Sequence, residues 1–313
     1  MKILLATDGS ECADRAALFL TRFPFSARDE ITVLHVITEV PYEDDAYANI
    51  KRFFKGVSPR ILESSAKILK TLVSKVTLRE EEGSPDSMIM NVAVNEGFDL
   101  IVMGTRGITG MKSLFLGSVT RSVAITSSVP VLVTRQTQWG LSPPMKVLLA
   151  TDGSPSAEAT ARLLTHLPFP SDTACMIVQV PWSAYSRIPE KFAPGVDEKI
   201  GEDFAWIRSM EHEKARHIIE QSSEIVGSSF SRLENHIVTG DPASEILNAA
   251  ERFHADIVAA GSRGLKGIRG AMGSVSRRIL SHARCPVLIG KAPKEQEQEF
   301  LSMAVHTGNQ VAE

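Results

Sequence analysis

The sequence MKILLATDGS at residues 1–10 returns almost unchanged as MKVLLATDGS at residues 145–154, an offset of 144. Further matches follow in the same order, namely LTRFPF (20–25) with LTHLPF (164–169), FDLIVMGTRG (98–107) with ADIVAAGSRG (255–264), and VPVLV (129–133) with CPVLI (285–289). Ordered matches over nearly the whole chain indicate a duplicated domain rather than a short-period solenoid. The offset rises from 144 to 157 between Val180 and Gly240, so the second copy carries 13 extra residues there, net.

The duplication divides the chain of 313 residues into two domains of similar size. We expect domain 1 at residues 1–138, a linker at 139–144, domain 2 at 145–292 and a polar tail at 293–313. The linker is expected within QTQWGLSPP (136–144), because its glycine and paired prolines interrupt regular structure.

Each copy alternates short apolar strands with helical patterns. In the first copy we expect strands at 3–6, 31–37, 77–83, 99–104 and 130–134, and helices at 10–23, 60–76, 85–97 and 118–128. Uniformly apolar strands that alternate with helices are typical of a parallel sheet covered on both faces. The sequence therefore predicts an α/β fold of two repeated, open, parallel five-stranded sheets with helices on both faces. Because the last strand of each copy is a short apolar edge, we expect these strands to pair or be covered, which makes the chain an intramolecular pseudo-dimer.

The composition is that of an ordinary globular protein, with 43% hydrophobic and 23% charged residues. The formal net charge is −3, and neither half is basic enough to indicate nucleic-acid binding by bulk charge. The cysteines Cys12, Cys175 and Cys285 lie far apart, which favours reduced thiols over a disulfide framework or a zinc cluster. No apolar run approaches the roughly 18 residues that span a bilayer. We therefore expect a cytoplasmic protein with no membrane segment.

The stretch MGTRGITGMKSLFLGSVT (103–120) places four glycines between an apolar strand and a helix. Ligands of open parallel sheets bind beyond the carboxyl ends of the strands, and a helix N-terminus attracts anions. Gly104 and Gly107 would let the backbone turn and approach a phosphate, while Gly117 and Ser118 begin the helix, which Ser118 can cap. Both clusters can converge on a polyphosphate. The alternative is that the glycines only form turns and Ser118 is only a cap.

Two other nucleotide motifs are excluded, because no Gly-Lys-Ser/Thr follows a P-loop spacing and no G-x-G-x-x-G follows the first strand. The interval Gly104, two residues, Gly107, nine residues, Gly117-Ser118 resembles the nucleotide motif of the ATP-binding branch of the universal stress proteins. Both copies resemble this family nearly end to end, as in a tandem universal stress protein. The resemblance implies a Rossmann-like fold, similar to that of the adenine-nucleotide alpha-hydrolases. It also implies ATP or another adenine nucleotide at the strand tips, with Mg or Mn on the phosphates and no metal held by protein side chains.

The resemblance also assigns roles by position in the first copy. Asp8, with Ala6 and Thr7, would meet the ribose and adenine, Val36 would contact adenine through its main chain, and Met103 would flank the base. The residues that would line the phosphates are Gly104, Arg106, Gly107, Gly117, Ser118 and Val119. The corresponding positions in the second copy are Thr151, Asp152, Val180, Gly261, Arg263, Gly264, Gly273 and Ser274. Taken alone, Asp8 could instead cap the first helix, Met103 could fill the core and Arg106 could be a solvated side chain.

The second copy departs from this motif by one residue. Eight residues separate Gly264 from Gly273, whereas nine separate Gly107 from Gly117. We expect the deletion to shift one glycine cluster or shorten the start of the helix, and so to make nucleotide binding weaker or altered in the second copy. Binding of a different anion and a vestigial site are the alternatives.

The first functional hypothesis is a stress-response or regulatory protein whose bound ATP controls its conformation or its partners. The second is a slow ATP hydrolase or an adenylating enzyme of related fold, although the adenylating signatures S-G-G-x-D-S, H-I-G-H and K-M-S-K-S are absent. A structural partner protein with decayed sites is a third hypothesis, which the intact first motif disfavours. No residue is a candidate catalytic group. A homodimer of the whole chain is left open, because no specific residue indicates it.

Overall fold

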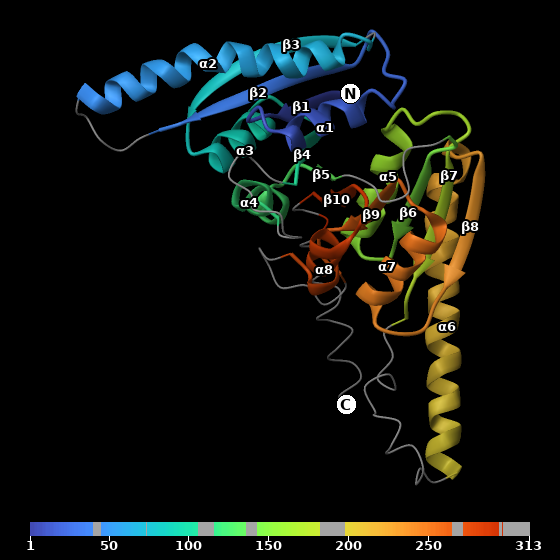
Figure 1. Cartoon of the computed structure of the whole chain (residues 1–313). Helices are drawn as coiled ribbons and strands as arrows, with labels where there is room; N and C mark the ends of the chain where they lie inside the picture. Colours follow the sequence, from blue (N-terminus) through green and yellow to red (C-terminus); the bar gives the residue numbers. More distant parts are fainter. Residues whose placement is uncertain are drawn as a thin grey trace.

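The computed structural model describes residues 1–39, 45–72, 74–105, 116–135, 143–181, 198–264, 272–293 and 296. In these residues helices cover both faces of one sheet (Figure 1). Most of the expected linker, at 139–142, and most of the expected tail lie outside the described residues. The domain boundaries that the sequence suggests therefore stay predictions.

The elements follow the expected alternation in both repeats. The first repeat contains β1 (Lys2–Ala6), α1 (Glu11–Leu20), β2 (Glu30–Thr38), α2 (Asp45–Leu69), β3 (Lys75–Gly83), α3 (Pro85–Asn95), β4 (Leu100–Gly104), α4 (Ser118–Thr126) and β5 (Val131–Thr134). The second contains β6 (Lys146–Ala150), α5 (Pro155–His166), β7 (Ala174–Gln179), α6 (Glu198–Val226), β8 (Arg232–Ile237), α7 (Pro242–Phe253), β9 (Ile257–Gly261), α8 (Ser274–His282) and β10 (Val287–Gly290).

The two repeats share a single ten-stranded sheet with the order β3-β2-β1-β4-β5-β10-β9-β6-β7-β8. All pairs within a repeat are parallel, as predicted, whereas β5 and β10 pair antiparallel in the middle of the sheet. The expected pairing of the two last strands is thus confirmed. Because β5 and β10 run in opposite directions, the carboxyl ends of the two sets of strands lie at opposite edges of the sheet.

Reciprocal contacts strengthen this junction. Arg135, which follows β5, donates hydrogen bonds to the carbonyls of Ala283 and Leu280 at the end of α8. Lys291, at the equivalent position after β10, donates to the carbonyl of Ala124 in α4 at 2.9 Å. Cations at helix C-termini interact favourably with the helix dipole. Both hydrophobic clusters, one on each face of the sheet, contain residues of both repeats, so the repeats form one packed body.

One predicted helix has different bounds from those expected. The apolar pattern suggests a helix at 60–76, but α2 begins at Asp45 and ends at Leu69. Val76 belongs instead to β3, where it pairs with Ile31 of β2. The helix also continues through Pro59, although proline disfavours a helix interior because it lacks a backbone N–H.

Candidate nucleotide site

The carboxyl ends of three neighbouring strands meet at one edge of the first repeat. β1 lies between β2 and β4. Its last residue, Ala6, pairs with Leu34 of β2, two residues before Val36. Leu5 pairs with Val102 of β4, the residue before Met103. Thr7 continues beside β2, because its amide donates to the carbonyl of Leu34 at 2.9 Å. The structure therefore brings these four predicted residues to the same edge of the sheet.

Asp8 occupies the turn between β1 and α1. Its carboxylate accepts a hydrogen bond from the amide of Ser10 at 3.0 Å, and the hydroxyl of Ser10 in turn accepts from the amide of Ala13. Ser10 is therefore the N-cap of α1, and the alternative in which Asp8 caps this helix is wrong. Asp152 and Ser154 repeat the arrangement in the second repeat.

Thr7 is held by the protein itself. Its side chain is buried, and its hydroxyl oxygen accepts hydrogen bonds from the Ser65 hydroxyl at 3.0 Å and the Gly9 amide at 3.2 Å. Thr7 thus fixes the turn that carries Asp8. Ser65 was not among the residues predicted from the sequence. Its signal would have been a serine on the apolar face of α2, repeated as Ser222, which donates to Thr151 at 3.2 Å.

Gly104 at the end of β4 has a packing role. A Cβ added to this residue would lie 2.6 Å from the backbone carbon and oxygen of Cys12 in α1. The end of β4 thus approaches the first turn of α1 too closely for any side chain. Gly261 is equally close to α5, with Ala157 N 2.6 Å from an added Cβ. Met103 is 5% exposed and belongs to the core, in agreement with the simpler interpretation of its sequence position.

The helix α4 begins at this edge with no side-chain cap. Gly117 is its N-cap, and the Gly117 amide donates to the carbonyl of Thr105 at 2.8 Å. Ser118 is the first helical residue and is exposed, so the prediction that Ser118 caps the helix is wrong. In α1, α5 and α7, by contrast, a Ser or Asp side chain accepts from a first-turn amide. The start of α4 therefore offers backbone N–H groups, including that of Val119, with no capping side chain to accept from them.

Thr120 fastens this helix to the strand, since its hydroxyl donates to the carbonyl of Gly104 at 2.8 Å. Ser276 makes the same bond to Gly261 at 2.6 Å. The sequence analysis did not assign these residues a role, although both end the repeated GSVT and GSVS motifs. Arg106 and Gly107 lie outside the described residues.

The second repeat keeps the same helix start despite its deletion. Gly273 is the N-cap of α8 and donates to the carbonyl of Ser262 at 2.8 Å, as Gly117 does to Thr105. Both α4 and α8 contain nine residues, and their N-cap torsions differ by no more than one degree. The prediction that the deletion shortens the helix start is therefore wrong. A shift of the glycine cluster stays a prediction, because Gly107 lies outside the described residues.

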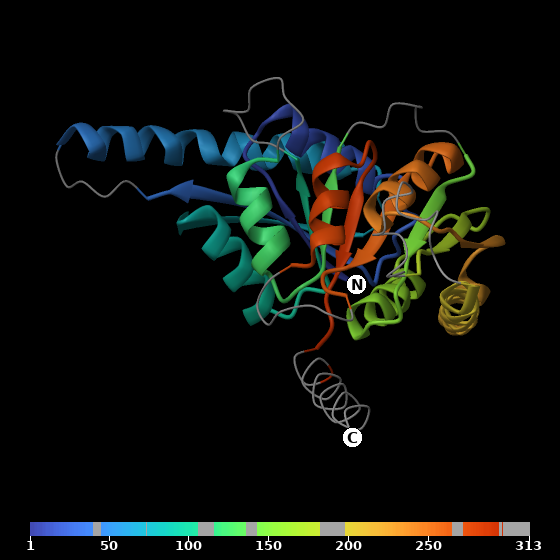
Figure 2. The same cartoon turned by 90° about the horizontal axis from the view of Figure 1, so that it is seen from below.

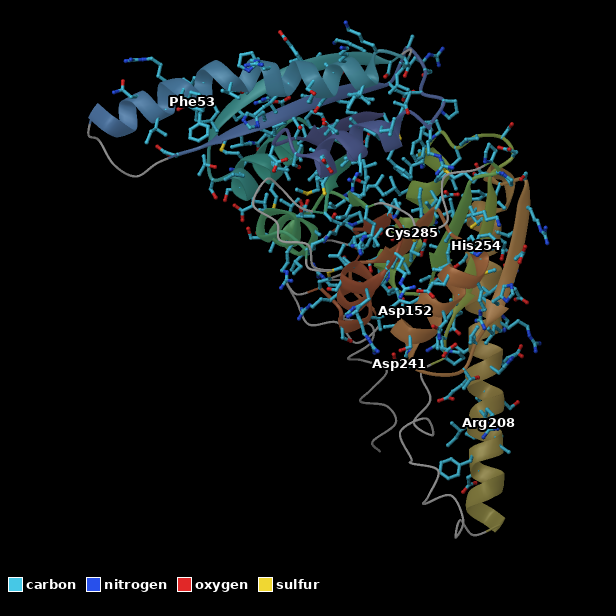
Figure 3. All side chains as sticks on the ribbon, viewed as in Figure 1. Phe53, Asp152, Arg208, Asp241, His254 and Cys285 are labelled. Atoms are coloured by element: carbon cyan, nitrogen blue, oxygen red, sulfur yellow. The ribbon has the colours of Figure 1, made fainter. Side chains whose placement is uncertain are left out.

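Side chains of the second repeat anchor the start of the loop after β9. The hydroxyls of Ser154 and Ser156 both donate to the carbonyl of Arg263, whose amide donates back to Ser156 at 3.1 Å. Gly264 lies against Asp152, so that an added Cβ would be 2.5 Å from a carboxylate oxygen (Figure 3 labels Asp152). The first repeat has Cys12 at the position of Ser156, and its sulfur lies 4.0 Å from the Thr105 hydroxyl.

The described part of the chain contains neither a candidate metal site nor a candidate membrane-spanning helix. No three His, Cys, Asp or Glu side chains gather there in a way that could hold a metal ion. None of the described helices combines the length and apolar character that a membrane span requires.

Comparisons with known proteins agree on one family. Residues 1–135 and 192–291 match the model of the universal stress protein family. A universal stress protein of Thermus aquaticus is 35% identical over 138 residues, which cover 42% of this chain and 97% of that protein. A solved universal stress protein of Archaeoglobus fulgidus has 23% identity and a TM-score of 0.62, covering 94% of this chain and 97% of that chain. A family protein of Arabidopsis thaliana was solved with AMP bound, at 23% identity and a TM-score of 0.35, covering 49% of this chain and 95% of that chain.

Proposed function

Because the chain belongs to the universal stress protein family, we propose that its first repeat binds ATP or another adenine nucleotide beyond the carboxyl ends of β1, β2 and β4. The observation that carries this proposal is the start of α4. That helix begins at the same edge of the sheet with a glycine N-cap and no side-chain acceptor for its first amides. An anion is the natural partner of such N–H groups.

The residues around this edge fit the parts of a nucleotide. The backbone of Val36 would face adenine, and the partly buried carboxylate of Asp8 would accept hydrogen bonds from ribose hydroxyls. The amides of Ser118 and Val119 would bind phosphate oxygens, together with Arg106 and Gly107. A divalent cation, Mg or Mn, would be bound by the phosphates, and the protein's share would be to position them.

The role we propose for this site is regulatory. Bound ATP would bridge the end of β4 and the start of α4, and this bridge would change the conformation or partners of the chain in a stress response. Thr120 supports such coupling, because its hydrogen bond joins the first turn of α4 to the end of β4. A ligand that binds both elements would therefore stabilise one arrangement of the two.

We further propose that the second site is weaker. The loop between Gly264 and Gly273 is one residue shorter than the loop between Gly107 and Gly117, so its backbone N–H groups would follow the phosphate oxygens less closely. The hydroxyl of Ser156, which stands where the first repeat has Cys12, also donates to the carbonyl of Arg263, so a nucleotide would have to displace an anchored loop. Losing one or two charge-assisted hydrogen bonds at about 1.5–3 kcal/mol each would weaken binding by roughly tenfold or more.

Calorimetric titration of nucleotide-free protein with Mg-ATP tests both proposals. We expect about one tight site per chain, lost in a Gly117→Val, Ser118→Ala double variant and retained in the matched Gly273→Val, Ser274→Ala variant. Both glycines have extended backbone torsions (φ −60° and −59°, ψ 153°) that valine adopts, so both variants should fold. Unchanged affinity in the folded first variant would overturn the proposed site. Two equal tight sites would overturn only their inequality.

A further inference from the structure

Both repeats carry a helix that is longer than the strand before it. The helix α2 contains 25 residues and α6 contains 29, which correspond to roughly 38 and 44 Å. The preceding strands β2 and β7 contain nine and six residues, or about 30 and 20 Å. The first turns of α2 and the N-terminal half of α6 therefore project beyond the sheet, in different directions (Figures 1 and 2).

The two helices can be aligned by a shared contact. Ser65 of α2 donates to Thr7, and Ser222 of α6 donates to Thr151, which sets an offset of 157 between the helices. The exposed Ile50 then corresponds to Ile207, and the exposed Phe53 to Met210. Large apolar side chains thus project from equivalent positions in both halves of the duplication.

These side chains form two apolar surfaces on the projecting helices. The α2 tip consists of Ile50, Phe53 and Phe54, of which Phe53 is 67% exposed (labelled in Figure 3). The α6 tip consists of Trp206, Ile207 and Met210, of which Trp206 is 66% exposed. Isolated exposed apolar residues are common, but clusters of large ones on a projecting element mark an interaction surface.

The charges beside the two tips have opposite sign. Residues 49–60 of α2 contain four basic residues and no acidic one, whereas residues 203–213 of α6 contain three acidic residues and one basic residue. Lys51 and Lys55 also form ion pairs with Glu82 of β3, which reduces but does not reverse the positive charge of the α2 tip. Two α2 tips would repel each other, and so would two α6 tips, whereas one of each would attract.

We propose that the occupant of these surfaces is a second copy of this chain, with the α2 tip of one copy packed against the α6 tip of the other. In a two-fold dimer residue i meets residue j and residue j meets residue i, so both tips of both copies are used. The apolar side chains supply the contact area, and the opposite charges select unlike over like pairing.

The full-length chain tests this by sedimentation velocity over a range of concentrations. We expect the wild type to form a species of twice the 34.1 kDa chain mass, and both Phe53→Glu and Met210→Lys to dissociate at least about tenfold more readily. Each substitution adds a charge that repels the partner tip. Mixing the two variants should restore association, because the intact α6 tip of one can meet the intact α2 tip of the other.

The matched control is Leu18→Glu, which changes a 54% exposed leucine on α1 and should leave the dimer intact. A monomeric wild type, dimerisation of either variant alone as strong as that of the wild type, or no association in the mixture would overturn the proposal. Flotation with vesicles of phosphatidylserine and phosphatidylcholine tests whether the tips bind a membrane instead of a second copy of the chain. Vesicle binding that Phe53→Glu abolishes, together with a monomeric wild type, would assign the α2 tip to a lipid surface instead.

Discussion

Replacing Gly104 by alanine should destabilise the fold before it affects any ligand. The added methyl group would lie 2.6 Å from the backbone carbon and oxygen of Cys12 and 2.9 Å from its Cβ. Backbone atoms in the first turn of α1 cannot rotate away as a side-chain end can, so β4 and α1 must separate. Such overpacking costs about 1–3 kcal/mol, and the backbone contact places this case at the upper end. We expect about 3 kcal/mol, or a fall in Tm of roughly 5 °C for a chain of this length.

The matched control is Gly273→Ala at the other end of the equivalent glycine loop. There the nearest atoms lie 3.6–3.7 Å from an added Cβ, an ordinary contact distance. Alanine restricts the unfolded chain, which stabilises by about 0.4–1 kcal/mol, but it is a poorer N-cap than glycine by a similar amount. The net change should therefore stay within about 1 kcal/mol of zero.

Calorimetric melting of both variants without nucleotide measures the loss of stability caused by the added methyl group. ATP titration of each variant then shows whether the same group also blocks the approach of the nucleotide. A Gly104→Ala chain that melts like the wild type but no longer binds ATP would refute the packing argument. Equal destabilisation by the two substitutions would also refute it, because the argument depends on the difference between the two contact distances.

Three further outcomes are expected. Burial raises the pKa of the Cys175 and Cys285 thiols to about 12, so a thiol reagent at pH 8 should titrate only the partly exposed Cys12 until the protein is unfolded. Hydrogen bonds from neighbouring serine hydroxyls, chiefly that of Ser122, lower the pKa of Asp86 below its ordinary 3.8. The ionised carboxylate therefore stabilises the fold above that pH, and the destabilisation caused by Asp86→Asn at pH 7 should fade in melts at progressively lower pH as the wild-type carboxyl becomes protonated. Arg135→Met removes two charge-assisted hydrogen bonds to the end of α8 and should lower the free energy of unfolding by about 2 kcal/mol. In calorimetry we expect a lower Tm for one joint transition of both repeats. Separate melting of the two repeats would contradict the shared core.

The regular part of the fold was predictable because its determinants are local. The strands at residues 3–6 and 100–104 are apolar throughout, and the structure buries them on both faces. The helix α2 was harder, because Gly56 and Pro59 disfavour a helix over its first half. Its end was misplaced because the helical apolar spacing continues through Val76, whose β-sheet pairing with Ile31 depends on a distant segment.

The sequence indicated where the candidate site would lie, but not all the contacts that shape it. The strand ends and the start of α4 lie where the glycine motif indicates. The close approach that requires Gly104 to lack a side chain comes from Cys12, some 90 residues earlier, so no local pattern reveals it. Likewise, the effect of the deletion in the second repeat depends on the hydrogen bond between Gly273 and Ser262, which keeps the start of α8 in place.

The antiparallel pairing of β5 with β10 also has a genetic consequence. In a homodimer of single-repeat chains, one gene encodes both sides of the central junction, so every substitution appears twice and the two sides cannot diverge. Here Arg135 and Lys291 occupy equivalent positions and hold opposite helices with different side chains. A substitution on one side of the junction therefore leaves the other side unchanged, and a second substitution on the same side can compensate for it. β5 and β10, each of which would be an edge strand in a single repeat, are already paired with each other. Single-repeat relatives made in the same cell therefore cannot add a strand there and form mixed assemblies.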